Sequence, residues 1–243
     1  MRKPRYIVFD GADGCGKTTQ LEKLKEILTK QGLPVYHTRA LGGDGSCEFQ
    51  QSIRKVLLNK KFPADQVDLV FEEQLFSMAD NEGVKDAIKF LDKNEEGLVL
   101  KDRGLASHVV YSQARGMQDD QIGRVHGRLF NTEKEISRSH GALHLLFVPS
   151  DVKFTMARIA ARAKATGTEV IERLENPIFQ KKVTDGMSSF FLSPFAAKFT
   201  IETIMVGPDD SIEAVGEKVK RALRNYGYTF DAPALAEGAA VTA

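Results

Sequence analysis

Cysteine, an excess of charge of one sign and long hydrophobic runs are all scarce in this sequence. The 243 residues include two cysteines, Cys15 and Cys47, too few to staple a fold of this size, which fits a reducing cytoplasm. The 34 lysines and arginines nearly balance 33 aspartates and glutamates, so no basic field predicts a polymeric nucleic acid as partner. No apolar run approaches the ~20 residues of a membrane span, so we expect no membrane association.

What is present is the composition of an ordinary globular protein. Hydrophobic residues make up 42% of the chain and charged residues 28%, which excludes wholesale disorder. The amino terminus leads directly into the strand-like segment Tyr6–Phe9 rather than into the apolar core of a signal peptide. We expect one domain over residues 1–230. The small residues of 231–243 predict a disordered tail.

Short runs rich in β-branched and aromatic residues alternate with segments of helical periodicity. This alternation predicts an α/β fold with a parallel sheet. The predicted strands are Tyr6–Phe9, Val35–Thr38, Leu98–Leu100, Leu143–Val148 and Phe199–Val206.

Helical spacing is clearest at three places. Leu21, Leu24 and Leu28 share one face of a first helix, and Ile212 to Leu223 form a last helix entered through a capping segment at 208–211. A long helix is predicted over 65–93, with a weak point at 81–83.

A glycine-rich motif lies between the first strand and the first helix. Residues 11–18, Gly-Ala-Asp-Gly-Cys-Gly-Lys-Thr, satisfy the P-loop pattern, in which backbone N–H groups cradle phosphates, Lys17 reaches the β/γ-phosphates and the Thr18 hydroxyl holds Mg²⁺. Asp13 is unusual beside a triphosphate, so it either faces a sugar hydroxyl of an acceptor or makes a turn hydrogen bond. The predicted ATP-binding residues are Gly11, Gly14, Cys15, Gly16, Lys17, Thr18 and Thr19.

Charged residues end two other predicted strands. Asp102 and Arg103 follow the strand at Leu98–Leu100, and Arg39 follows Val35–Thr38. The carboxyl ends of parallel strands face the ligand crevice, so Asp102 is a candidate for Mg²⁺ and the two arginines are candidate phosphate clamps. A surface ion pair between Asp102 and Arg103 is the alternative.

The order of these motifs resembles the thymidylate kinases over roughly residues 5–225. The P-loop with Asp13 is followed by Thr38-Arg39, Gly42-Gly43, Arg54, Phe76, the Asp102-Arg103 pair with Ser107 and Tyr111, and an arginine-rich segment around Arg158 and Arg162. The resemblance implies a three-layer α/β/α P-loop kinase fold, with a five-stranded parallel sheet flanked by helices and a helical lid at about 158–172. It also implies a homodimer.

Roles for the acceptor site follow from the resemblance. Asp13 would face the sugar 3′-hydroxyl, Arg39 and Arg103 would hold the monophosphate, and Phe76 would stack on the base, although its spacing also suits a core residue. The implied acceptor-binding residues are Asp13, Arg39, Arg54, Phe76, Arg103, Ser107, His108 and Tyr111, with Ser107 and His108 at the base edge and Tyr111 beneath the deoxyribose.

The sequence departs from the family pattern at three places. Ala40 stands where a glutamate is usual, with Asp44 as a possible substitute. The base-reading arginine after Phe76 is missing, and Asp80 and Asn81 occupy this stretch, so a donor is exchanged for an acceptor or an amide and the base need not be thymine. An arginine restored there is then expected to shift base selectivity. Gly104, where an aromatic is common, is expected to open space near the phosphate.

Phosphoryl transfer requires alignment and charge stabilisation. The variable P-loop positions hold no cation, so Arg158 and Arg162, four residues apart on one predicted helix face, are expected to supply it; a solvated basic face is the alternative. With Lys17 and Asp102 they form the predicted catalytic set, and Thr18 and Asp102 the metal set. We therefore expect an Mg²⁺- and ATP-dependent deoxynucleoside monophosphate kinase, with dTMP the favoured acceptor. A kinase for dUMP or another dNMP and a non-catalytic NTP-binding protein are the alternatives.

Overall fold

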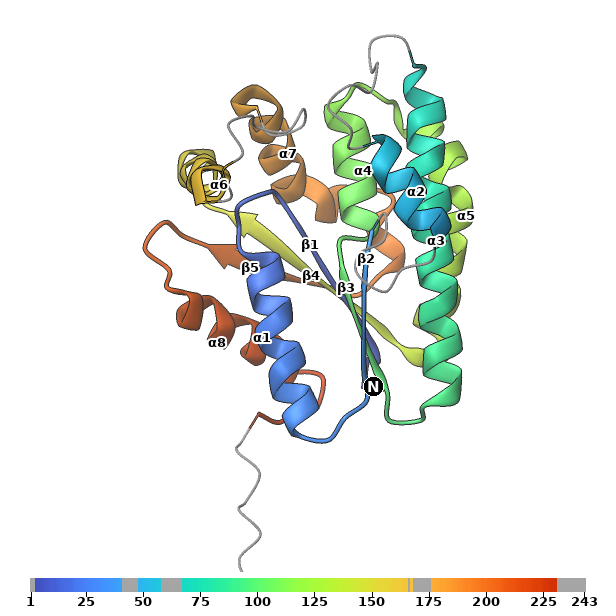
Figure 1. Cartoon of the computed structure of the whole chain (residues 1–243), viewed down its shortest axis with the longest axis vertical. Helices are drawn as coiled ribbons and strands as arrows, with labels where there is room; N and C mark the ends of the chain where they lie inside the picture. The colour runs from blue at the N-terminus through green and yellow to red at the C-terminus, as the bar shows by residue number, and fades with distance from the viewer. Residues whose placement is uncertain (1–2, 41–47, 58–66, 166, 168–175, 231–243) are drawn as a thin grey trace, which may run out of the picture.

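A computed structural model describes residues 3–40, 48–57, 67–165, 167 and 176–230. Five parallel strands form one sheet in the order β2-β3-β1-β4-β5 (Figure 1). The strands are β1 (Tyr6–Gly11), β2 (Val35–Arg39), β3 (Leu98–Asp102), β4 (Ala142–Pro149) and β5 (Ile201–Val206).

Eight α-helices surround the sheet in the described part of the chain. They are α1 (Lys17–Lys30), α2 (Glu48–Leu57), α3 (Leu69–Lys93), α4 (Leu105–Ala114), α5 (Asp119–His140), α6 (Val152–Ala165), α7 (Pro177–Ser189) and α8 (Ile212–Arg224). Two short 3₁₀ turns, Phe190–Leu192 and Ala196–Lys198, precede β5.

The sheet is apolar on both faces, so helices cover both. Along β1, Ile7 and Phe9 pack in the cluster that includes Leu21 of α1 and Val219 of α8, whereas Tyr6 and Val8 pack towards α3 and α5. Figure 1 shows α1 beside α8 in front of the sheet at the left, and α3 beside α5 at the right. The predicted three-layer α/β/α architecture is confirmed.

Local signals explain where several helices begin. The Ser211 hydroxyl caps α8 by accepting the Ala214 N–H at 3.1 Å, as the capping segment predicted. The expected weak point in the long helix does not interrupt it, because α3 runs unbroken from Leu69 to Lys93. Gly83 has a packing reason: a Cβ there would lie 2.8 Å from Gln50 Nε2 on α2.

Several expectations concern residues outside the described ranges. These are the tail at 231–243, Asp44 and Cys47, and most of the lid after α6. Among the described residues, no helix is long and apolar enough to cross a bilayer.

Candidate active site

The glycine-rich motif forms the turn that joins β1 to α1. Gly11, Gly14 and Gly16 all have positive φ angles, of 147°, 76° and 88°. A Cβ on Gly11 would lie 2.4 Å from the Phe147 carbonyl oxygen, and one on Gly14 would lie 2.5 Å from that of Thr155. Glycine is required at these two positions by backbone angle and by space, and the loop consequently packs against β4 and α6.

Lys17 curls back over this loop. Its Nζ donates a hydrogen bond to the Ala12 carbonyl at 2.7 Å, and the Cys15 thiol donates to the same oxygen at 2.9 Å. Both side chains are buried, while Thr18 and Thr19 are exposed. The amine is therefore held inside the loop, where a P-loop lysine meets phosphate oxygens.

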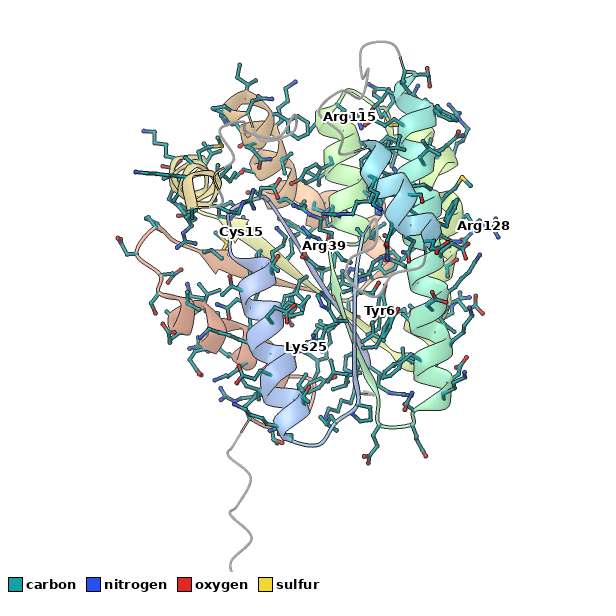
Figure 2. The ribbon with its side chains drawn as sticks, viewed as in Figure 1. Tyr6, Cys15, Lys25, Arg39, Arg115 and Arg128 are labelled. Carbon is teal, nitrogen blue, oxygen red and sulfur yellow. The ribbon has the colours of Figure 1, made fainter. Side chains whose placement is uncertain are left out.

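A cavity of about 560 Å³ opens at the carboxyl edge of the sheet. Figure 2 shows Cys15 and Arg39 at this edge. The cavity brings together P-loop residues and arginines from three other segments: it is lined by residues 13–20, Arg39, Asp102, Arg103, Arg158, Ile159, Arg162, Asp210, Ser211, Ile212 and Val215.

Strand register explains why Arg39 and Asp102 meet. The two residues are paired across β2 and β3, and Phe9 of β1 pairs with Asp102 on the other side. Thr18 Oγ1 donates to Asp102 Oδ2 at 2.9 Å, and Arg39 Nε lies 3.6 Å from the same oxygen. Asp102 is thus tied to the P-loop helix rather than forming a surface ion pair with Arg103.

The pair of Thr18 and Asp102 fits a magnesium ion bound together with a nucleotide. Asp102 is almost fully buried, and its Oδ1 atom has no hydrogen-bond partner among the described residues. A buried acceptor without a donor is costly, and a cation would relieve that cost. Mg²⁺ commonly takes one or two protein ligands and completes its shell with phosphate oxygens and water, so two side chains suffice for such a site.

Asp13 is the centre of a second cluster. Its carboxylate forms an ion pair with Arg103 and accepts hydrogen bonds from Tyr111 Oη at 2.8 Å and Gln180 Nε2 at 3.0 Å. Burial raises the pKa of Asp13, but Arg103, Lys17 and the two hydrogen bonds outweigh it and lower the pKa to about 2. Asp13 therefore makes side-chain contacts instead of the turn hydrogen bond considered from sequence.

Gln180 is a member of this cluster that sequence reasoning missed. It lies fully buried on α7, whose N-cap Asn176 accepts the Phe179 N–H at 2.9 Å and fixes the start of the helix. A glutamine within an ordinary helical pattern gives no signal, because only the packing of α7 against α4 brings it to the P-loop.

Arg158 and Arg162 both reach the cavity from α6, as their spacing predicted. The Arg158 guanidinium lies over the Phe154 ring, 5.0 Å from its centroid. This contact holds the planar group beside the P-loop opening without neutralising it.

The predicted base-edge residues, Ser107 and His108, are buried. Ser107 Oγ donates to Asp10 at 2.6 Å, and His108 Nε2 contacts Asp80 Oδ2 at 2.8 Å. Phe76 packs partly buried beside Ile53 of α2, and Arg54 is half-buried on the same helix. Their binding roles stay predictions.

Asp80 corrects the expectation that a carboxylate at this position faces the base. Asp80 is fully buried, and Lys101 Nζ donates to its Oδ2 at 2.8 Å and to Glu133 Oε1 at 2.9 Å. Burial raises the pKa of Asp80, but the charges and hydrogen bonds of Lys101 and His108 together outweigh burial and lower the pKa. Asn81 accepts a hydrogen bond from Thr132 of α5 at 2.9 Å. Both side chains are therefore committed within the protein.

Gly104 also corrects an expectation. A Cβ on this residue would lie 2.6 Å from Val8 Cγ1, so no space is opened there. The missing side chain instead allows the start of α4 to approach β1 closely.

Comparison with known proteins follows the same motifs. A family model described as thymidylate kinase matches residues 9–219. The thymidylate kinases of Geobacter sp. strain M21 and Citrifermentans bemidjiense are each 32% identical to this chain over 223 residues, covering 90% of it and 91% of the relative. That of Caldicellulosiruptor saccharolyticus is 27% identical over 223 residues, covering 91% and 96%. These matches confirm the predicted resemblance and enzyme class, and they show that the chain belongs to the thymidylate kinase family.

Proposed function

We propose that this protein transfers the γ-phosphoryl group of ATP to dTMP, giving ADP and dTDP. The observation that carries the proposal is the composition of the cavity. It is lined by the P-loop, by the hydrogen-bonded pair of Thr18 and Asp102, and by the arginines of β2, the β3–α4 turn and α6. Family membership and the names of the relatives support the same reaction.

On the donor side, the P-loop N–H groups and Lys17 would hold the triphosphate. Thr18 and Asp102 would hold Mg²⁺, which neutralises charge on the phosphates when bound. Arg158 and Arg162 line the same cavity as the P-loop. We assign them to the charge on the transferred group, because the loop itself has no other cation between Gly11 and Lys17.

On the acceptor side, Arg39 and Arg103 would bind the monophosphate. Arg103 is paired with Asp13 in the structure, so phosphate binding would draw the guanidinium away from a carboxylate that Tyr111 and Gln180 continue to hold. Asp13 would then be available to the sugar 3′-hydroxyl, and Tyr111 would lie beneath the deoxyribose. Arg54, Phe76, Ser107 and His108 complete the proposed acceptor site.

A different acceptor base is the second candidate, and a specific observation favours it. Neither Asp80 nor Asn81 supplies the family's arginine, and both are bonded inside the protein. Base recognition would then fall to His108 and its neighbours, which leaves dUMP or a modified pyrimidine nucleotide as an alternative substrate.

Three further features belong to the proposal. We expect one kinase domain over residues 1–230 with its lid at about 158–172, and a cytoplasmic protein. We also expect a homodimer, because Phe49 and Met78 are exposed beside a groove of about 680 Å³ between α2, α3 and α5. Sedimentation of the purified protein tests the dimer.

An ADP-release assay with purified protein tests the reaction. The acceptors are dTMP, dUMP, dCMP, dAMP, dGMP and UMP, each titrated at saturating ATP and Mg²⁺. The proposal expects the highest kcat/KM with dTMP; a higher value with dUMP supports the second candidate. Stoichiometric ATP binding without turnover of any acceptor would leave a non-catalytic NTP-binding protein.

A further inference from the structure

The turn that carries Arg103 is held in an uncommon backbone conformation. Arg103 has φ of 69°, and it is the only described residue other than glycine with a positive φ. Its N–H donates to the Phe9 carbonyl of β1 at 2.9 Å. Residues in the left-handed region persist only where their surroundings fix them, so the contacts around this turn decide where the guanidinium points.

Asp10 provides the main set of those contacts from the neighbouring strand. Its Oδ1 atom accepts the Gly104 N–H at 2.8 Å, the Ser107 N–H at 3.0 Å and the Ser107 hydroxyl at 2.6 Å. Gly104 is the N-cap of α4 and has no side chain with which to cap it. The Asp10 carboxylate therefore takes the place of the missing cap and also lies at the positive end of the helix dipole.

The environment of Asp10 favours a permanently charged carboxylate. Asp10 is fully buried, and His144 Nδ1 of β4 lies 3.7 Å from its Oδ2 atom. Burial raises the pKa of Asp10, but His144, Ser107 and the Gly104 N–H outweigh burial and hold the pKa well below its usual range.

Close packing adds to the hydrogen bonds. The contact between Gly104 and Val8 leaves no room for a side chain at position 104. Val8, Phe9 and Asp10 are consecutive in β1, and Gly11, the next residue, begins the P-loop. One strand thus fixes both the start of the P-loop and the turn that carries Arg103.

We infer that Asp10 is a positioning residue, which aims Arg103 at the acceptor's phosphate by capping α4 from β1. The inference rests on the proposed role of Arg103. Asp10 touches neither nucleotide in this scheme, because it is fully buried and does not line the cavity. It acts by keeping the acceptor arginine at a fixed place relative to the ATP-binding loop.

The test compares Asp10→Ala with Asp10→Asn in the full chain. Asp10→Ala removes the acceptor of four hydrogen bonds, the three at Oδ1 and one from the Ala106 N–H to Oδ2 at 3.4 Å. We expect the KM for dTMP to rise at least about tenfold with a lower kcat, since small misplacements of a binding group are costly. The affinity for ATP, measured by calorimetry without acceptor, should stay within about threefold. In Asp10→Asn the amide oxygen can replace Oδ1, so both constants should stay near wild type.

Val109→Ala is the matched control for a merely structural effect. Val109 is fully buried in the apolar cluster of α4, and its side chain has no group that could hydrogen-bond to the β3–α4 turn. We expect it to lower the thermal midpoint without a selective rise in the KM for dTMP. The same rise in Val109→Ala, or equal weakening of ATP and dTMP by Asp10→Ala, would overturn the inference.

Two further variants keep the inference testable if Asp10→Ala does not fold. Gly104→Ala displaces the same turn while Asp10 is intact, and adding Val8→Ala removes the contact that causes the displacement. A raised KM for dTMP that the second substitution restores supports the inference, and an unchanged KM in Gly104→Ala overturns it.

Arg103→Ala separates this inference from the proposed function. A raised KM for dTMP in Arg103→Ala with none in Asp10→Ala refutes the inference alone. An unchanged KM in Arg103→Ala refutes the proposed role of Arg103 and the inference together.

Discussion

An arginine at position 80 tests whether the family's base-reading side chain can be restored on α3. Asp80→Arg would remove a carboxylate whose Oδ2 lies 2.8 Å from Lys101 Nζ and would bury a second cation there. Breaking a buried ion pair costs about 3–5 kcal/mol, and two like charges about 4 Å apart add roughly 4 kcal/mol at an effective dielectric constant of about 20. A domain is stable by only about 5–15 kcal/mol, so we expect Asp80→Arg to lose most of its stability.

Urea unfolding followed by circular dichroism measures this loss, and Asp86→Arg on the same helix is its control. Asp86 pairs with Lys89 at the surface, with Oδ1 2.9 Å from Nζ, and its replacement should cost no more than about 1 kcal/mol. The buried position argues against the sequence-based expectation that an arginine here changes base selectivity. A stably folded Asp80→Arg with an altered ratio of kcat/KM between dTMP and dCMP would refute this reasoning and return residue 80 to the acceptor pocket.

Three other predictions concern the cavity. Lys17→Ala should lower kcat on the order of a hundredfold or more with little change in thermal midpoint, because the amine acts on transition-state charge; near-wild-type turnover would exclude the proposed mechanism. Arg103→Ala should raise the KM for dTMP roughly 10- to 100-fold and spare ATP binding, as expected for loss of a charge-assisted contact; equal weakening of both ligands would move Arg103 to the donor site. The pKa of Asp13 is lowered from 3.8 to about 2, so ionised Asp13 contributes about 2 kcal/mol to the free energy of unfolding above pH 4, and this contribution is lost as the pH falls towards 2. The stabilities of wild type and Asp13→Asn should therefore converge in acid. A constant difference between their urea midpoints from pH 4 to pH 2 would contradict the lowered pKa.

The strands and the P-loop could be predicted because their signals are local. Runs such as Tyr6–Phe9 and Leu143–Val148 have both the length and the residue types of buried strands, and the glycine spacing of the P-loop is tied to its backbone angles. The carboxyl-edge rule also placed Arg39 and Asp102 together correctly, since parallel register depends on topology that the βα alternation already implies.

The end of β3 shows why the remainder could not be predicted. The predicted strand stopped at Leu100, because a lysine usually marks a surface, yet Lys101 is fully buried. Its burial depends on Asp80 of α3 and Glu133 of α5, which lie 21 and 32 residues away in sequence. The pattern of apolar and polar residues within β3 contains no information about partners so far away in sequence.

Dependence on partners distant in sequence also explains why sequence reasoning missed two residues near the site, Asp10 and Gln180. Asp10 and Gln180 act through hydrogen bonds to segments 94 and 167 residues away, to Gly104 and Asp13 respectively. The residues of a sequence motif bind the ligand, and they occur at fixed spacings because the ligand has a fixed shape. The positions of residues that hold the ligand-binding side chains in place depend instead on the tertiary packing of the individual protein. In this protein they are Asp10, the next-to-last residue of β1, and Gln180, in the first turn of α7. Asp10 holds the turn that carries Arg103, and Gln180 holds Asp13, so the ion pair between Arg103 and Asp13 depends on groups that need not contact the ligand.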